Sequence, residues 1–313
     1  MIRSVWQEWK SESMLEIIYL YGYKFSVMTE TQQDHFERIN QVLQYIHYNL
    51  HEAIDLEGLA RRSNYSIFHF HRIMSAYLGE SLGAYIQRIR LEMAASLLRY
   101  SKLEVQDVAF QVGYESPAAF NKAFKRRFSA TPTVFRSSKT EFKQKYNPKE
   151  RQLIMDNLTT QPEWKTLDQK QVIFVQRIGS YHKAAGEAWK SVCAYAGPNG
   201  LIQKDSDFYG ICYDDPSVTD AEKCRYEACI VVNQDVKPEG EIGVKQLRKG
   251  KYAVFTLTGS YDLLKRAYDY IFGAWIAENK IELDNSPVME KYLNSPESTP
   301  EDQLITEIWI PIN

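Results

Sequence analysis

The second half of this 313-residue chain is constrained most strongly by an internal repeat at an offset of 80 positions. Three sets of identical residues share this offset: Gly-Ser-Tyr at 179 and 259, Pro216 and Pro296, and Glu227 and Glu307. Because one offset relates all three, this half is predicted to contain two copies of one supersecondary unit.

Each copy has the same predicted order of elements. β-Branched runs bounded by Gly, Pro and Asp predict strands at 172–179 and 252–259, helical spacing follows at 181–194 and 261–278, and two further strands complete each copy. We therefore expect an α+β domain of two pseudo-twofold-related strand-helix-strand-strand units. The sheet is expected to be mixed, with both helices on one face and a ligand groove at the seam between the copies.

The first half is also duplicated, with an offset of 50 that pairs Phe70 with Phe120 and Tyr85 with Phe135. Each copy has the pattern of a short helix, a tight turn and a second helix, following an amphipathic helix predicted at 36–49. The fold class expected for the whole chain is two domains, an all-α double helix-turn-helix followed by the α+β domain.

Turn and cap residues support these two helix pairs. Asn64 and Gly113 stand where the chain must turn, and both residue types tolerate the left-handed backbone conformation. Ser66 and Ser116 are placed to cap the second helix of each pair, and Pro117 is suited to a first helical position. One long apolar-striped helix at 86–98 would hold the two second helices apart by ~34 Å, one turn of DNA, so the DNA site need not be a palindrome.

The segment "VAFQVGYESPAAFNKAFKRRFSATPTVFR" resembles the signature of the AraC/XylS family of transcription regulators, and the resemblance covers about 36–136. Asn64 and Ser129 depart mildly from the family pattern. The resemblance implies base contacts from the first copy and mainly phosphate contacts from the second. The implied DNA-binding residues are Ser66, Phe68, His71 and Arg72, then Ser116, Pro117, Ala118, Asn121, Lys122, Lys125 and Arg126. The alternative is that these are solvated helix faces.

Charge is distributed unevenly between the halves. Residues 34–151 carry 18 Lys and Arg against 12 Asp and Glu, a net +6, whereas 152–313 carry 17 against 24, a net −7. A polyanionic partner is therefore expected for the first half only, which agrees with double-stranded promoter DNA.

The last predicted strand raises the question of a ligand. Alternation places Glu307 on the same face as Ile305 and Trp309. A carboxylate between large apolar side chains requires a cation, and an organic cation between aromatic rings would satisfy it. The expected ligand-binding set is Glu307, Trp309, Trp275, Tyr252, Phe255, Tyr261 and Tyr292. The alternatives are that Glu307 pairs with a Lys or Arg such as Arg248 and that the aromatic residues are core.

Three segments, "GSYDLL", "VMEKYLNSPE" and "TEIWIPI", give residues 153–313 a resemblance to GyrI-like effector-binding domains. This resemblance implies binding of amphipathic, cationic aromatic small molecules, and the domain order implies a one-component transcription regulator rather than an enzyme. Two alternatives stay open: a small-molecule hydrolase with Glu307 as general base, and a protein-interaction module. RNA polymerase is left open as a further partner, and no cofactor or metal is expected.

Four Cys without CxxC spacing favour a reducing cytosol, so a cytoplasmic location is expected. Residues 14–27 are too short and too charged to span a bilayer. The expected organisation is a poorly ordered N-terminal extension at 1–33, a DNA-binding domain at 34–138, a linker at 139–152 and an effector domain at 153–313. The working chain is expected to start near Met28.

Overall fold

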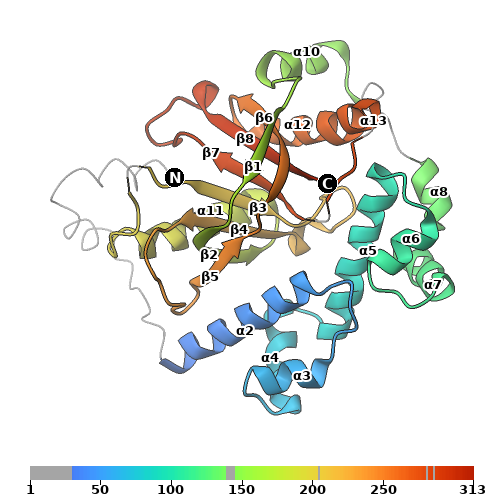
Figure 1. Cartoon of the computed structure of the whole chain (residues 1–313), viewed down its shortest axis with the longest axis vertical. Coiled ribbons are helices and arrows are strands. Elements are labelled where there is room, and N and C mark those ends of the chain that lie inside the picture. Colours follow the sequence, from blue (N-terminus) through green and yellow to red (C-terminus); the bar gives the residue numbers. More distant parts are fainter. Residues whose placement is uncertain (1–29, 139–144, 204, 280, 285) are drawn as a thin grey trace. The chain divides into compact units, whose positions relative to one another are not determined.

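The computed structural model describes residues 30–138, 145–203, 205–279, 281–284 and 286–313. Within these ranges the chain divides into two compact units, coloured by sequence in Figure 1. One unit comprises residues 31–140 with the segment 214–220, and the other comprises the remaining residues from 141 onward. The expected extension at 1–33 lies almost wholly outside the described residues.

The first unit is all helical, as expected. Its helices are α2 (Glu30–Tyr48), α3 (Leu56–Arg62), α4 (Ile67–Leu78), α5 (Leu82–Tyr100), α6 (Val105–Gln111), α7 (Pro117–Phe128) and α8 (Pro132–Ser137). The turn between α3 and α4 has Asn64 at φ 54°, and the turn between α6 and α7 has Gly113 at φ 83°. The hydroxyl oxygen of Ser66 accepts a hydrogen bond from the backbone amide of His69, and that of Ser116 accepts one from the backbone amide of Ala119. The predicted caps and turns are therefore confirmed.

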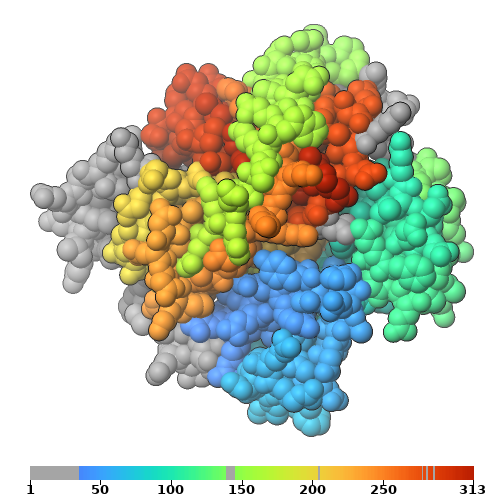
Figure 2. Space-filling model, in the orientation of Figure 1, coloured from blue at the N-terminus to red at the C-terminus, as the bar shows by residue number. Residues whose placement is uncertain are grey.

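Helix α5 joins two hydrophobic cores. The N-terminal part of α5, with Tyr85 and Ile89, packs into a core around Phe70, whereas its C-terminal part packs around Phe120 and Phe124. Figure 2 shows the result as two lobes, a blue one that includes α2 and α4 and a teal-to-green one that includes α6 to α8. Each helix pair therefore has a core of its own, and α5 sets the distance between them.

The second unit contains α10 (Pro148–Asn157), which begins inside the range expected to be linker, and one eight-stranded sheet. The strands are β1 (Glu163–Leu167), β2 (Lys170–Ile178), β3 (Phe208–Cys212), β4 (Arg225–Val231), β5 (Gly243–Leu247), β6 (Gly250–Thr258), β7 (Val288–Tyr292) and β8 (Ile305–Ile312). Their order is β1-β6-β8-β7-β3-β4-β2-β5, and every pairing in the described residues is antiparallel. The prediction of a mixed sheet was wrong, because each strand runs in the opposite direction to every strand with which it pairs.

The duplication extends further than the sequence indicated, because each copy has an additional first strand. Strands β1 and β5 begin 80 positions apart, at Glu163 and Gly243. β1 pairs with β6 of the second copy and β5 pairs with β2 of the first, so the copies exchange their first strands. The seam is the pairing of β3 with β7, where Gly210 lies opposite Glu290, also 80 positions away.

Both long helical segments cover the same face of the sheet. Helix α11 (Tyr181–Ala196) packs on β2 and β4, and the second helical segment packs on β6 and β8; Val288 of β7 contacts both cores. The second segment runs from η3 (Tyr261–Leu263) through α12 (Leu264–Tyr270), a π-helical turn η4 (Ile271–Trp275) and α13 (Ile276–Asn279). The predicted helix at 261–278 is therefore present, with a π turn that α11 does not have.

Candidate functional site

Helix α4 presents the side chains expected to contact bases on one exposed face. Phe68 is 80% exposed, and His71 and Arg72, three and four residues further on, are exposed beside it. Ser66 Oγ accepts the His69 amide at 3.4 Å, which leaves its hydroxyl hydrogen free to donate to a phosphate. An exposed aromatic ring next to a histidine and an arginine is a surface with both apolar and hydrogen-bonding character.

Helix α7 presents a more cationic face. The exposed residues of this face are Ala118, Asn121, Lys122, Lys125 and Arg126, which follow the spacing of one side of a helix. Ser116 and Pro117, at the start of α7, are only half exposed. The Arg126 guanidinium donates to Gln87 Oε1 of α5 at 2.8 Å, so Arg126 is held against the connecting helix.

A buried ionic network fixes α7 on α5. Glu92 of α5 accepts from Arg127 Nη2 at 3.1 Å and from Arg88 Nη1 at 3.0 Å, and Arg88 Nε also donates to Glu80 at 2.8 Å. Sequence analysis did not select these residues, because nothing in the spacing distinguishes them from solvated charges. Through Arg127, this network links the C-terminal part of α7 to α5.

In the second unit, Glu307 is paired with a cation of the protein itself. Its Oε1 accepts from Lys165 Nζ of β1 at 2.8 Å, and its Oε2 accepts from Trp309 Nε1 at 2.9 Å. Lys165 Nζ also lies 3.0 Å from Glu163 and 5.8 Å from the Trp309 ring centroid. The alternative that Glu307 pairs with a Lys or Arg of the protein is therefore the one observed, although the partner is Lys165 and Arg248 pairs with Asp284 instead.

A second ion pair is related to this one by the offset of 80. Lys245 of β5 contacts Glu227 of β4, and the Tyr213 hydroxyl donates to Glu227 at 2.8 Å. Burial alone would lower the pKa of Lys245, but the adjacent Glu227 carboxylate raises it well above the ordinary value. The Lys245 side chain is 6% exposed and that of Lys165 is 32% exposed, so the two pairs differ mainly in access to water.

The seven residues expected to bind a ligand do not lie together. Glu307, Trp309 and Tyr252 are on the sheet face opposite the helices, whereas Phe255 and Trp275 pack in the core beneath α12. Tyr261 and Tyr292 lie at the seam, on the helix-covered face, with ring centroids 5.6 Å apart. The predicted single site is therefore divided, and only its seam part adjoins an acid without a cationic partner.

That acid is Glu290, which sequence analysis did not select. It is 4% exposed, and its carboxylate accepts from Tyr268 Oη at 2.8 Å, Tyr292 Oη at 2.5 Å and Cys212 Sγ at 3.7 Å. No Lys, Arg or His of the described residues forms an ion pair with it. Burial raises the pKa of Glu290, and the three hydrogen bonds offset only part of that effect.

Aromatic side chains surround Glu290. The Trp189 and Tyr292 ring centroids are 5.6 Å apart, Trp189 Nε1 donates to Tyr226 Oη at 2.9 Å, and the Tyr226 and Tyr292 hydroxyls are 3.0 Å apart. Tyr181, Trp189, Tyr261 and Tyr292 are half-buried. The arrangement combines a buried negative charge, neutral hydrogen-bond donors and several aromatic faces.

Gly210 makes room for this cluster at the seam. A Cβ atom at position 210 would lie 2.3 Å from Tyr226 Oη and 2.8 Å from Tyr292 Oη. Only glycine therefore permits both hydroxyls to lie opposite Glu290. Gly210 and Glu290 occupy equivalent positions of the two copies, so the copies differ in residue type where they meet at the seam.

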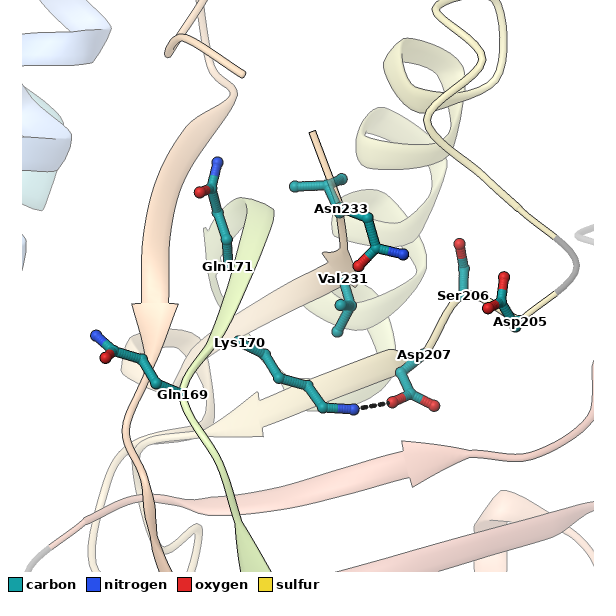
Figure 3. Close-up of a pocket in the computed structure, with 9 residues that line it drawn as sticks. Gln169, Lys170, Gln171, Asp205, Ser206, Asp207, Val231 and Asn233 are labelled. Carbon is teal, nitrogen blue, oxygen red and sulfur yellow. Dashed lines mark hydrogen bonds and ion pairs between the residues drawn. The ribbon is translucent and has the colours of Figure 1, made fainter. Parts of the chain in front are cut away.

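A separate hollow of about 310 Å³ lies at the ends of β2, β3 and β4. Figure 3 shows Lys170 and Asp207 pointing toward one another on one side of it, with Gln171 and Asn233 further along. Burial raises the pKa of Asp207, but hydrogen bonds from Lys170 and Lys291 outweigh burial and bring the pKa below its ordinary value. Because Asp207 is already paired with Lys170 and Lys291, this hollow does not present a buried acid without a cationic partner as the seam does.

Two further findings limit the chemistry of the described residues. Among them, no helix has the length and hydropathy needed to cross a membrane. They also contain no group of three or more His, Cys, Asp or Glu arranged to hold a metal ion.

Comparisons with known proteins match both halves. Residues 59–138 match a helix-turn-helix domain model, and residues 160–313 match the GyrI-like small molecule binding domain. The chain is 34% identical over 104 residues to the probable transcription factor PqrA of Proteus vulgaris, covering 33% of this chain and 85% of PqrA. It is 33% identical over 100 residues to the transcriptional regulator Rob of Salmonella typhimurium, covering 32% of this chain and 35% of Rob.

Solved structures give partial likenesses. The DNA-binding domain of AdpA in complex with a target DNA shares 28% identity, covering 33% of this chain and 92% of that one, with a TM-score of 0.32. The EcmrR–DNA complex shares 18% identity, covering 53% of this chain and 61% of that one, with a TM-score of 0.45.

Proposed function

Because the chain belongs to the AraC family of transcription regulators and ends in a GyrI-like small-molecule binding domain, we propose that it is a one-component regulator of transcription. Its first domain, residues 34–138, binds promoter DNA, and its second, residues 153–313, binds an aromatic organic cation. The cytoplasm is the proposed location, and RNA polymerase is a proposed partner of the DNA-bound regulator.

The observation that carries the cation proposal is the carboxylate of Glu290. It is buried against three neutral donors, and burying a charge without a counter-ion costs several kcal/mol. A ligand cation would supply that counter-ion, and the half-buried rings of Trp189, Tyr261 and Tyr292 would add cation–π attraction of roughly 0.5–2 kcal/mol. Glu307 is the weaker candidate because Lys165 already neutralises it.

The exposed faces of α4 and α7 support the DNA proposal with different roles. Arg72 has the planar fork that binds guanine, and Phe68 can contact a thymine methyl group. Lys122 and Lys125 are suited to phosphates, since an ammonium group is a point charge without a base-specific pattern. We therefore assign most of the base contacts to α4 and most of the positioning contacts to α7.

An enzymatic role is the weaker proposal. The hydrolase hypothesis uses Glu307 as general base, but both oxygens of its carboxylate already accept hydrogen bonds, from Lys165 and Trp309. We expect no turnover of an activated ester by the full chain, and turnover that Glu307→Gln abolishes would revive that hypothesis.

The test of the cation proposal uses a matched pair of probes. Methyltriphenylphosphonium is a cation, and triphenylphosphine oxide is a neutral molecule of nearly the same shape. Calorimetry with the full chain should show binding of the cation at least ten times tighter than of the neutral probe, and Glu290→Gln should remove most of that difference. Glu222→Gln, at an exposed acid of the same domain, is the control. Equal affinities for the two probes would refute the cation proposal.

The DNA proposal is tested by fluorescence anisotropy with duplexes from the neighbouring promoters. Binding should weaken steeply with salt, since each neutralised phosphate releases a counter-ion. Affinity that does not depend on salt, or no affinity for any of these duplexes, would contradict the proposal.

A further inference from the structure

A second acid, Glu297, lies near the seam and carries an unused acceptor. It follows β7 in the segment before η5 (Glu301–Gln303), and it is 6% exposed. Ser295 Oγ donates to its Oε2 at 2.6 Å. Its Oε1 is buried and has no hydrogen-bond partner in the part of the chain that the structure describes.

Glu297 and Glu290 both lie near Tyr261. The phenol of Tyr261 is close enough to both carboxylates that burial and the two negative charges together raise its pKa. Cys193, one helical turn after Trp189 on α11, has its pKa raised by burial and by the charge of Glu297. Ser260, next to Tyr261, donates to Glu301 at 2.5 Å, which ties this segment to the start of the second helical segment.

A structural role does not account for the second oxygen of Glu297. Its one hydrogen bond closes a local turn, and an amide or a hydroxyl could accept that bond without burying a charge. A buried acceptor left unpaired costs about 1–3 kcal/mol, more for a charged group. This cost of burying the Glu297 carboxylate is offset when a cationic donor binds to its Oε1.

We propose that Glu297 is a second anionic subsite of the Glu290 site, and that the preferred ligands are aromatic dications with one cationic group at each carboxylate. This inference rests on the proposed cation-binding function. A monocation neutralises only one of the two acids, whereas a dication of suitable length neutralises both, and its second contact gains from the high effective concentration of a tethered group.

The experiment compares bisamidines with a matched monoamidine by calorimetry on the full chain at pH 8. The bisamidines have two benzamidine groups joined by three to six methylene groups, and the control ligand is a benzamidine that carries only the alkoxy chain. We expect at least one bisamidine to bind at least ten times tighter than the monoamidine. Glu297→Gln should abolish that advantage, and a cooperative urea unfolding transition of the variant shows that it is folded.

Asp302→Asn is the matched control, since it removes one negative charge from an exposed residue five positions away. If the monoamidine binds but no bisamidine binds tighter, or if the advantage survives Glu297→Gln, the dication inference is overturned and the proposed function stands. If neither ligand binds, the proposed function fails together with the inference.

Discussion

Replacing Glu297 with glutamine should stabilise the protein at neutral and alkaline pH. Burial raises the pKa of Glu297 to about 7 from an ordinary 4.5, and the hydrogen bond from Ser295 offsets only part of this. A carboxyl that holds its proton more tightly in the folded state stabilises the fold at low pH. That stabilisation is fully present below about pH 4.5 and is lost as the pH rises through about 7.

The magnitude follows from the difference between the two pKa values. Each unit of pKa corresponds to about 1.4 kcal/mol, so the difference between 4.5 and 7 corresponds to about 3–4 kcal/mol as an upper bound. Glutamine keeps the shape and the acceptor for Ser295 but carries no charge. The free energy of unfolding of Glu297→Gln should therefore match the wild type near pH 4.5 and exceed it by about 1–3 kcal/mol at pH 8.

Urea unfolding at closely spaced pH values between 4.5 and 8 measures this difference. The groups that face Glu297 are Tyr261, Cys193 and, across Tyr261, Glu290. They are present in both proteins, so their own titration cancels to first order when the two curves are subtracted. A difference that is independent of pH, or that shrinks as the pH rises, would refute the assignment of a buried, unpaired carboxyl.

Three further predictions concern other parts of the chain. Lys245→Met should lower the free energy of unfolding by about 3–5 kcal/mol because it leaves the buried carboxylate of Glu227 without a cation. Lys165→Met, at the more exposed pair, should lower it by about 1 kcal/mol. Equal losses in urea unfolding would contradict the difference in burial. Ser129→Gly should stabilise the first domain by about 0.5–1 kcal/mol, since Ser129 has φ 57°, and a lower thermal midpoint would count against this. Arg72→Ala should cost about 1–3 kcal/mol at one base position in anisotropy titrations, whereas Lys125→Ala should weaken all duplexes alike and reduce the salt slope by about one.

Local chemistry made the first domain predictable. The turns at Asn64 and Gly113 and the caps at Ser66 and Ser116 depend on residues within a few positions of one another, and all four are where the sequence predicted them. The repeat at an offset of 80 likewise predicted the helices and most strands of the second domain.

The proposed ligand site was not predictable in the same way because it depends on strand order. Glu307 was singled out by its neighbours along one strand, but its partner Lys165 comes from a strand 142 positions away. Glu290 became a candidate only when β7 was found beside β3, with Gly210 opposite it. Sequence alternation indicates which side chains share a face, but not which strand lies next to them.

The exchange of β1 and β5 has a consequence for how this domain could have arisen and how it can be divided. In a single copy of the repeat, the first strand would have no strand to pair with, and the edge of the second strand would be unpaired. Such a copy could complete its sheet only by associating with a second copy. The present domain is equivalent to such a pair joined end to end. Cutting the chain between β4 and β5 would yield two fragments that are each unstable alone but complementary when mixed.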